Sequence, residues 1–289
     1  MLDLNIAPYR DDFDAEKNFH KILFRPGYPV QSRELTQIQS ILQNQIKSFG
    51  DHIFKNGSMV IPGNVRHDLG VKAVRITVTP GIVASDWVNK RLFGVESEVT
   101  VHVIKTEQTG NDVVAYVKTV ANGITNNALD LLADDEPVEF LDDGGAVPVG
   151  STILSGAVTD ASLGFVNEGI YYVNGYFVRV DAQSVILSST SKTPSCKVGL
   201  VLSEEIISES DDSSLLDPAL GSSNENAPGA HRQKLSLVLT KYNTGEETDP
   251  SFILLFQLDA GELIRLVSFS TYSELMKTMA RRTYEESGN

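Results

Sequence analysis

The sequence contains a single cysteine, Cys196, among its 289 residues. One thiol can form no disulfide within the chain, and it is too few for a zinc site built from cysteines. A free cysteine is most often buried as a small apolar side chain. We therefore expect Cys196 to lie in the interior and to carry no chemistry.

Positive charge and long apolar runs are also scarce. The chain has 24 Lys and Arg against 38 Asp and Glu, a formal net charge of -14. A nucleic-acid backbone needs a positive protein surface, so we expect no nucleic-acid partner. No apolar run reaches the length of about 18 residues that marks a membrane span, so we expect no membrane span. The first residues, MLDLNIAPYRDDFD, have neither the basic start nor the apolar core of a secretory signal.

Motifs for catalysis or metal binding are missing as well. The histidines lack the close spacing of a zinc site, and they are His20, His52, His67, His102 and His231. Gly145 and Gly150 have the outer spacing of a phosphate-binding loop, but the lysine that would reach the phosphates is absent. The acidic clusters do not place oxygen ligands at the alternate positions of a calcium loop. We therefore predict no enzyme activity, no cofactor, no metal, and no catalytic or cofactor-binding residue.

Residues 31–49, QSRELTQIQSILQNQIKSF, are predicted to form a helix that is unusually rich in amides. Five residues share one helix face by their three- and four-residue spacing, and we call them the helix stripe: Leu35, Ile38, Leu42, Gln45 and Phe49. Gln45 occupies a position on this face where another large apolar residue would be expected. Ser32 is the expected N-cap, and Gly50 is the expected stop.

From about residue 64 onward, apolar and polar residues alternate with the period of a β-strand. Segments such as EVTVHVI and DVVAYVKTV are separated by turn signals at the spacing of a small sheet or barrel. Asn56-Gly57 and Asn174-Gly175 stand between apolar segments, which is the strongest short signal for a β-hairpin. The expected fold is mainly β, of the α+β class: antiparallel sheets, or a small barrel or sandwich, with an N-terminal helix and a short C-terminal helix.

A long loop at 208–232 joins two later predicted strands, KVGLVLSEEII and KLSLVLTKY. Loops of this length inside a domain are uncommon and are usually functional or disordered. Apolar anchors favour an ordered loop that clasps a neighbour, and they are Leu215, Leu216 and Leu220. The Ser, Asp and Asn content of the loop would also suit a flexible linker.

We divide the chain into four regions. An N-terminal arm, helix and hairpin at 1–63 would dock or oligomerise, and 64–190 would form a β-domain. A further β segment with the long loop covers 191–270. The region 271–289 contains TYSELMKTMARRTYEE, a predicted helix with Thr271 and Glu274 as a capping box.

Residues 8–63 resemble the start of a family of uncharacterised virion structural proteins of tailed bacteriophages. The shared features are an Arg25-Pro26-Gly27 turn, an amide-rich helix that starts with RELTQ at 33–37, and an FG-HIF segment at 49–54. SLLDPALGSSNENAPGAHR and the terminal ARRTYEESGN also resemble family segments. The resemblance therefore reaches both ends of the chain.

This resemblance implies a baseplate-associated or tail-fibre protein of the virion, made in the cytoplasm of the host bacterium. Such a protein would join the tail core to the host-recognition fibres, with other tail or baseplate proteins as partners. Fibre-type tail proteins are often trimers, so a homo-oligomer is expected, with a trimer favoured. Family members commonly continue past the ESGN segment, so a further region after Asn289 is expected.

An assembly role would explain the amides of the helix. Amides at the seam of a helical assembly fix register and oligomeric state at some cost in stability. Three copies could pack their helices around an axis, with each Gln45 meeting its mates. The alternative is a helix that packs on the chain's own sheet through Ile41 and Ile46.

A second class of function stays open, a tail-associated protein that binds or degrades glycans. Its aromatic residues could stack on sugars, although packing in a core or hairpin explains them equally well; they are Trp87, Tyr171, Tyr172 and Tyr176. Paired carboxylates in a cleft beside exposed aromatic residues would favour this class. Contacts made by the helix and the long loop would favour the adaptor.

Overall fold

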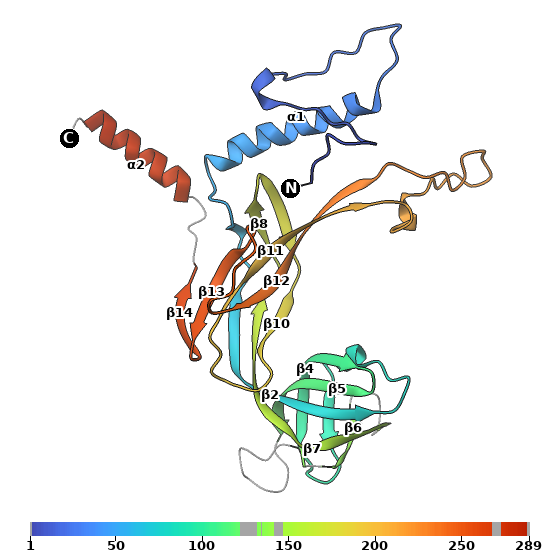
Figure 1. Cartoon of the computed structure of the whole chain (residues 1–289), viewed down its shortest axis with the longest axis vertical. Coiled ribbons are helices and arrows are strands. Elements are labelled where there is room, and N and C mark those ends of the chain that lie inside the picture. The colour runs from blue at the N-terminus through green and yellow to red at the C-terminus, as the bar shows by residue number, and fades with distance from the viewer. Residues whose placement is uncertain (1, 122–131, 134, 142–146, 268–272, 288–289) are drawn as a thin grey trace.

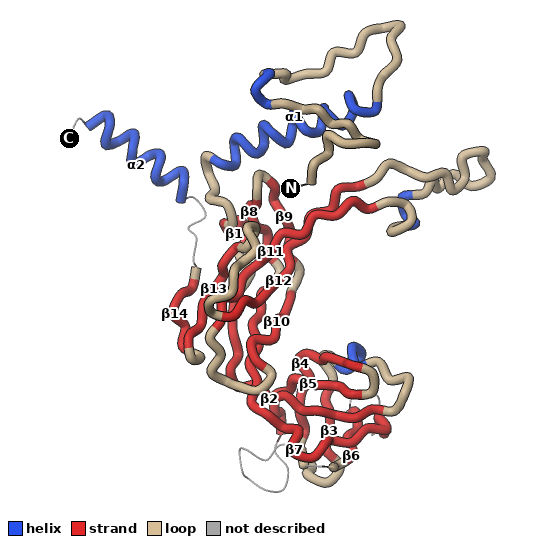
Figure 2. Tube along the Cα trace, in the orientation of Figure 1, coloured by secondary structure: helices blue, strands red, loops and turns tan. Residues whose placement is uncertain are grey.

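The computed structural model describes residues 2–121, 132–133, 135–141, 147–267 and 273–287. The molecule is elongated, with two β bodies stacked end to end and with α1 and the N-terminal arm beyond the second body (Figure 1). Strands make up most of the regular structure, and every pairing between the described strands is antiparallel (Figure 2). The predicted mainly β fold with antiparallel sheets and a helix towards each end is confirmed.

A seven-stranded sheet extends through both bodies, and its strands within residues 65–166 curl strongly to form the first body. In sheet order its strands are β10 (Gln183–Ser188), β7 (Val147–Val166), β2 (Val65–Val78), β5 (Asp112–Ala121), β4 (Thr100–Thr109), β3 (Arg91–Gly94) and β6 (Pro137–Phe140). β6 also pairs with β7, which brings the far edge of the sheet back towards its other side. The side chains on the inner face therefore share one core.

Alternation with a period of two places the apolar residues of the curled sheet in this core. On β4, Val101 and Val103 are fully buried, and His102 between them is only half-buried. The 3-10 turn η2 (Ala84–Trp87) adds the ring of Trp87, which packs edge-on against Phe140 with centroids 5.5 Å apart. Trp87 is therefore a core residue.

The second body brings two further antiparallel sheets together around a second core. The first has three strands, in the order β1 (Ser58–Ile61), β8 (Gly169–Val173) and β9 (Tyr176–Val180). The second has four, in the order β12 (Arg232–Asn243), β11 (Cys196–Ile207), β13 (Ile253–Asp259) and β14 (Glu262–Leu266). Tyr171, Leu200 and Phe256 are among the buried residues of this core.

Cys196 lies in the second core and is 1% exposed, which confirms the prediction that it is a buried side chain. Burial raises the pKa of its thiol. Leu187 belongs to the same core. The boundary drawn between residues 190 and 191 therefore falls within one packed unit.

β2 and β7 are long enough to take part in both bodies. On β2, Val65 packs against the second core, whereas Ile76 lies in the first. On β7, Val166 belongs to the second core and Ile153 to the first. The two bodies are therefore joined by continuous strands.

The two Asn-Gly pairs have different roles. Asn174-Gly175 connects β8 to β9 as predicted, with positive φ angles of 52° and 95° that suit this turn. Asn56-Gly57 does not form the predicted hairpin, because residues 52–57 contain no strand and β1 pairs with β8 instead. Asn56 Oδ1 accepts a hydrogen bond from the Asn174 N–H at 2.9 Å, so this turn packs on the β8–β9 turn.

Helix α1 covers Ser32–Asp51, which confirms the predicted helix; it begins one residue later and ends two residues later than predicted. The N-cap is Gln31 and not Ser32; the Gln31 N–H donates to the Glu34 carboxylate at 2.9 Å. Gly50 is not a stop but lies inside the last turn. The Tyr172 ring stands 2.6 Å from where a Cβ of residue 50 would be, so the close approach requires glycine.

β11 and β12 continue beyond the second body as a two-stranded hairpin (Figure 1). Both predicted strands are confirmed, and they pair with each other along their whole length. The tip is ordered by its own hydrogen bonds, from Gly229 N to Leu215 O (3.1 Å) and from Asp217 N to Ala227 O (2.9 Å). It also contains a short helical turn, η3 (Ser213–Leu215).

The remaining helical elements lie towards the two ends of the chain. η1 (Ala15–Lys17) is a single turn in the N-terminal arm, and α2 (Ser273–Ser287) is the predicted C-terminal helix. The predicted capping residue Thr271 lies outside the described residues. Neither helix in the described part of the chain has the length and apolar character that crossing a bilayer requires.

Candidate docking surface

The C-terminal half of α1 rests on the turn between β8 and β9. The Tyr172 hydroxyl lies 2.7 Å from the Asp51 carboxylate and 3.1 Å from the Lys47 carbonyl. Gln43 Nε2 donates to the Gly175 carbonyl at 2.7 Å. Burial and the Asp51 carboxylate raise the pKa of Tyr172, so its hydroxyl keeps the proton that it donates. This end of the helix is therefore fixed to the second body.

The N-terminal half of α1 is held by the arm that precedes it. Asp11 accepts a hydrogen bond from the Ser40 hydroxyl. Asp12 accepts one from the Gln37 amide and pairs with Arg33 at 3.4 Å. Several polar side chains of the helix are thus satisfied by their own chain, which explains part of its amide content.

Most of the helix stripe faces away from the rest of the chain, and Leu35 at its start also lines a cavity with Ile206 and residues 229–233 of the hairpin. All five of its residues are exposed, namely Leu35, Ile38, Leu42, Gln45 and Phe49. The exposed fraction is 52% for Leu35 and 69% for Phe49. No charged residue occurs from Leu35 to Ile46, so the stripe presents apolar and amide groups only. Single exposed apolar residues are ordinary, but a contiguous apolar face marks an interaction site.

The alternative position of α1, packed on its own sheet through Ile41 and Ile46, stays a prediction. Ile41 is buried but belongs to none of the three apolar clusters of the β-sheets. Ile46 is 38% exposed and lies one turn after Leu42, so it extends the stripe. The helix therefore turns much of its polar side inward and its apolar side outward.

The three leucines of the long loop differ in burial. Leu215 and Leu216 are half-buried within the turns of the tip, where Leu216 forms a β-bridge with Pro228. Leu220 is 89% exposed, so it does not anchor the loop within one chain. Their contact with another subunit stays a prediction.

A comparison with models of protein families matches most of the chain, including both the helix stripe and the hairpin tip. The family model described as "Domain of unknown function (DUF4815)" matches residues 7–136 and 139–289. The chain belongs to the DUF4815 family. Comparison with curated proteins and with solved structures gives no match.

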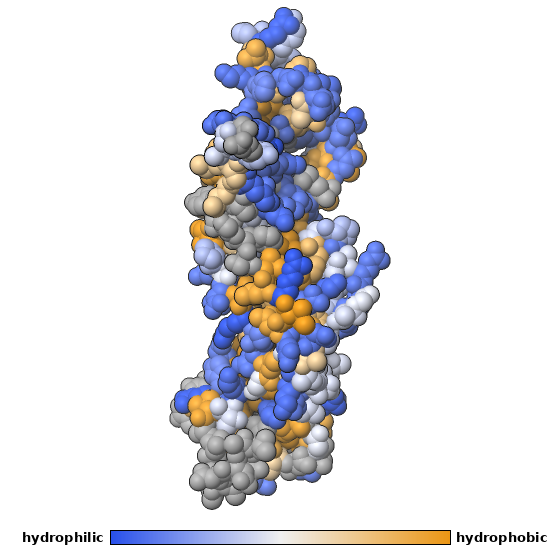
Figure 3. Space-filling view, turned by 90° about the vertical axis from the view of Figure 1, so that its left-hand side faces the viewer, coloured by the Kyte–Doolittle hydropathy of each residue, from blue (hydrophilic) through white to orange (hydrophobic). Residues whose placement is uncertain are grey.

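A second apolar surface of this DUF4815 chain lies on the edge strand β14. Among the described strands β14 pairs only with β13, and it exposes Leu263, Ile264 and Leu266. Figure 3 shows apolar surface about halfway along the molecule, at the level of β14. Sequence periodicity does not reveal this edge, because the place of a strand in a sheet depends on its pairing.

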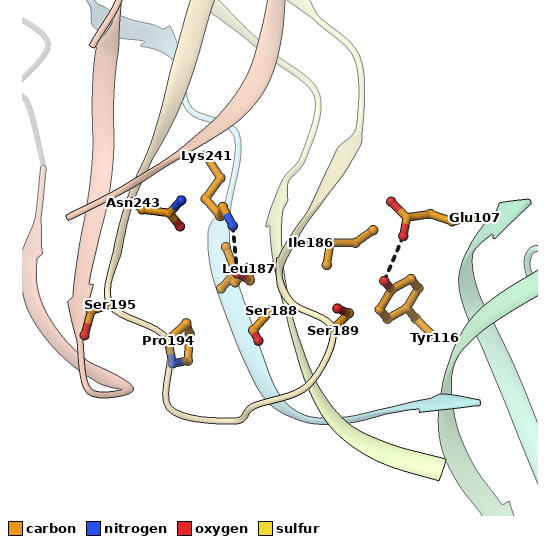
Figure 4. Close-up of a pocket in the computed structure, with 10 residues that line it drawn as sticks. All are labelled: Glu107, Tyr116, Ile186, Leu187, Ser188, Ser189, Pro194, Ser195, Lys241 and Asn243. Carbon is orange, nitrogen blue, oxygen red and sulfur yellow. Dashed lines mark hydrogen bonds between the residues drawn. The ribbon is translucent and has the colours of Figure 1, made fainter. Parts of the chain in front are cut away.

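A polar cavity of about 490 Å³ lies between the two bodies of the DUF4815 chain (Figure 4). On one side the Tyr116 hydroxyl donates to Glu107 at 2.9 Å, and on the other Lys241 donates to the Leu187 carbonyl at 3.2 Å. Glu107 is the one carboxylate among the 10 lining residues. The cavity therefore lacks the two carboxylates that most glycoside hydrolases use.

Three of the four aromatic residues considered for glycan binding are packed inside the DUF4815 fold. Trp87, Tyr171 and Tyr172 are at most 2% exposed, and Tyr176 is half-buried beside the second core. Packing therefore accounts for Trp87, Tyr171 and Tyr172, whereas Tyr176 lines a second cavity of about 710 Å³ that also contains Asp11, Asp12 and Asp14. Within the described residues, no group of three or more His, Cys, Asp and Glu is arranged to hold a metal ion.

Proposed function

We propose that this protein is a structural component of a tailed-phage virion, a baseplate-associated or tail-fibre adaptor that joins the tail core to the host-recognition fibres. The resemblance of residues 8–63 to phage virion proteins supports the proposal. The structural observation that carries it is the orientation of α1, whose apolar and uncharged stripe is exposed. An ordinary surface helix buries its apolar face.

The size of the stripe favours contact with further copies of the same helix. Leu35, Ile38, Leu42 and Phe49 are about half exposed, so covering them contributes roughly 3–6 kcal/mol from one helix. Association costs roughly 4–15 kcal/mol in lost freedom. In a trimer all three stripes are covered, so the apolar burial is about three times that of one stripe against a polar surface. This larger burial better offsets the cost of association.

Gln45 would set the register of such an assembly. Its amide is exposed in the C-terminal half of the stripe, between Leu42 and Phe49. Around a threefold axis the three amides can donate to and accept from each other, which satisfies groups that the contact removes from water. A shifted register would leave them buried against apolar side chains at a cost.

Replacing Leu35, Ile38 and Leu42 together with serine tests this proposal. These side chains are exposed in the single chain, so the β bodies should remain folded while the oligomer dissociates. The molar mass from light scattering should fall to that of one chain. The far-ultraviolet β-sheet spectrum should be unchanged.

The matched control replaces three equally exposed apolar residues of β14, Leu263, Ile264 and Leu266, with serine. This control should keep the oligomer. A parent protein that is a monomer at all concentrations would contradict the self-association, and so would a stripe variant that remains oligomeric. Wholesale unfolding of the stripe variant would show that α1 belongs to the monomer's own core.

A further inference from the structure

Positive charge is concentrated in one short part of the N-terminal arm. From Glu16 to Glu34 the intervening residues include four basic side chains and no acidic one, in a chain with a net charge of -14. The four are Lys17, Lys21, Arg25 and Arg33. We call residues 17–33 the basic arm.

The basic arm extends from the molecule beyond α1 (Figure 1), and most of its large apolar side chains are exposed. Its exposed apolar residues are Phe19, Leu23, Phe24, Tyr28 and Val30. Leu23 is 80% exposed. Lys21 and Arg25 form no ion pair with any described residue, and Arg25 lies over the Tyr28 ring at 4.3 Å. Exposed apolar side chains gathered in one segment mark an interaction site.

Negative charge is concentrated in the hairpin formed by the ends of β11 and β12. Residues 198–231, the acidic hairpin, contain no Lys or Arg, and their acidic residues are Glu204, Glu205, Glu209, Asp211, Asp212, Asp217 and Glu225. Hydrogen bonds from Ser208 lower the pKa of Asp211, and hydrogen bonds from Ser214 lower that of Asp212. These carboxyls are therefore ionised at neutral pH. The hairpin also exposes Ile206 and Leu220.

Within one chain, the acidic hairpin contacts the start of the N-terminal arm, before the basic arm begins. The hairpin is held by earlier residues of the arm, since Leu2 N donates to Glu204 at 2.6 Å and the Tyr9 hydroxyl is 2.6 Å from His231 Nδ1. Among the described residues, Lys21 and Arg25 of the basic arm form no ion pair with the acidic hairpin. Both segments extend outward from the same half of the molecule (Figure 1).

We propose that the basic arm of one copy binds the acidic hairpin of a neighbouring copy. The net charge is four positive on the first segment and seven negative on the second, and each adds exposed apolar side chains. Because the contact joins unlike segments, it leads from copy to copy, and a threefold rotation closes it as a ring with α1 near the axis. The inference rests on the proposed self-association and identifies a second contact for it.

Charge reversal in each segment, alone and together, tests this contact. Lys21→Glu with Arg25→Glu should weaken self-association by about tenfold or more in Kd, and so should Glu205→Lys with Glu225→Lys. Combining the four substitutions should restore association towards the parent value, because the charges are then exchanged. Sedimentation at several concentrations measures each Kd.

The matched control, Lys277→Glu with Arg281→Glu on α2, changes the net charge by the same amount as the first variant and should leave Kd unchanged. Raising the salt from about 0.1 M to about 1 M shortens the Debye length from about 10 Å to about 3 Å and should weaken the parent assembly. In the spectrum of each variant, an unchanged β-sheet signal confirms folding.

Unchanged association in either reversed variant, or no recovery in the combined variant, would overturn the contact. A second result would also overturn the contact: the parent binds anionic phosphatidylglycerol vesicles, and the Lys21→Glu, Arg25→Glu variant loses this binding while its self-association is unchanged. The basic arm would then bind a membrane surface. If these results coincide with dissociation of the Leu35, Ile38 and Leu42 variant, only the second contact fails. If that variant also stays assembled, the proposed function fails as well.

Discussion

Two neighbouring tyrosines on β8 differ in whether their buried hydroxyls are hydrogen-bonded. Tyr171 and Tyr172 are both fully buried. The Tyr172 hydroxyl reaches Asp51, whereas the Tyr171 hydroxyl has no hydrogen-bond partner among the described residues. Burial raises the pKa of Tyr171 to about 12. An unpaired buried hydroxyl costs roughly 1–3 kcal/mol, so Tyr171 is a weak point of the second core.

Tyr171→Phe should therefore increase the free energy of unfolding at neutral pH, by about 1 kcal/mol. The pKa of Tyr171 is higher in the folded chain than in the unfolded chain. The stability linked to this raised pKa is fully present below the unfolded pKa of about 10, where the hydroxyl is protonated in both states. It is lost as the pH rises through the folded pKa, because the hydroxyl ionises more easily in the unfolded chain. The phenylalanine variant should show a smaller loss of stability above about pH 10. Urea unfolding at about pH 7 and about pH 11 measures both effects.

Tyr172→Phe is the matched control, because it removes a hydroxyl that is hydrogen-bonded. It should lower the free energy of unfolding at neutral pH by about 1 kcal/mol. Equal destabilisation by the two variants would contradict the assignment of Tyr171 as unpaired.

At the scale of elements, α1 is positioned by a few contacts near its C-terminal end and by the arm. Gly50 is central to this attachment, because the Tyr172 ring occupies the space that a Cβ would need. In an exposed helix, alanine is favoured over glycine by about 1 kcal/mol. The steric contact reverses that preference here.

Gly50→Ala should thus destabilise the protein by roughly 1–3 kcal/mol. The ring of Tyr172 must move, and the end of α1 must separate from β8. Hydrogen exchange should show lower protection along α1, with little change in the curled sheet. Ser48→Ala, at an exposed position of the same helix, is the control and should change the stability by no more than about 0.5 kcal/mol. An alanine variant as stable as the parent would show that Tyr172 does not fix the helix.

At the scale of the whole molecule, β2 and β7 connect two cores that sequence order alone would separate. β7 contributes buried residues to both cores. β2 contributes buried residues to the first core and packs Val65 against the second. Separation of the bodies would therefore require breaking continuous strands. We expect the two bodies to unfold together.

Ile76→Ala in the first core and Leu200→Ala in the second should each lower the stability by roughly 2–5 kcal/mol. Both should shift the same single transition in a calorimetric scan. Val83→Ala, at an exposed position, should leave the transition in place. Two separate transitions, each moved by only one of the core variants, would contradict the coupling of the bodies.

Local patterns in the sequence were sufficient for several elements. The three- and four-residue spacing of Leu35, Ile38 and Leu42 predicted α1, and the alternation of Val99, Val101 and Val103 predicted a half-buried strand. Asn174-Gly175 predicted its hairpin. Each of these signals arises from backbone geometry over a few residues, which neighbours in the sequence control directly.

Tertiary structure decided everything that depends on contacts between distant segments. Asn56-Gly57 has the same hairpin signal, but no strand precedes it at residues 52–57 and β1 after it pairs with β8. The helix periodicity identified an apolar face, but only the hydrogen bonds to Asp11, Asp12 and Gly175 turned the opposite side inward. Periodicity specifies which residues share a face, whereas the direction of that face depends on which side of the helix finds partners in the rest of the fold.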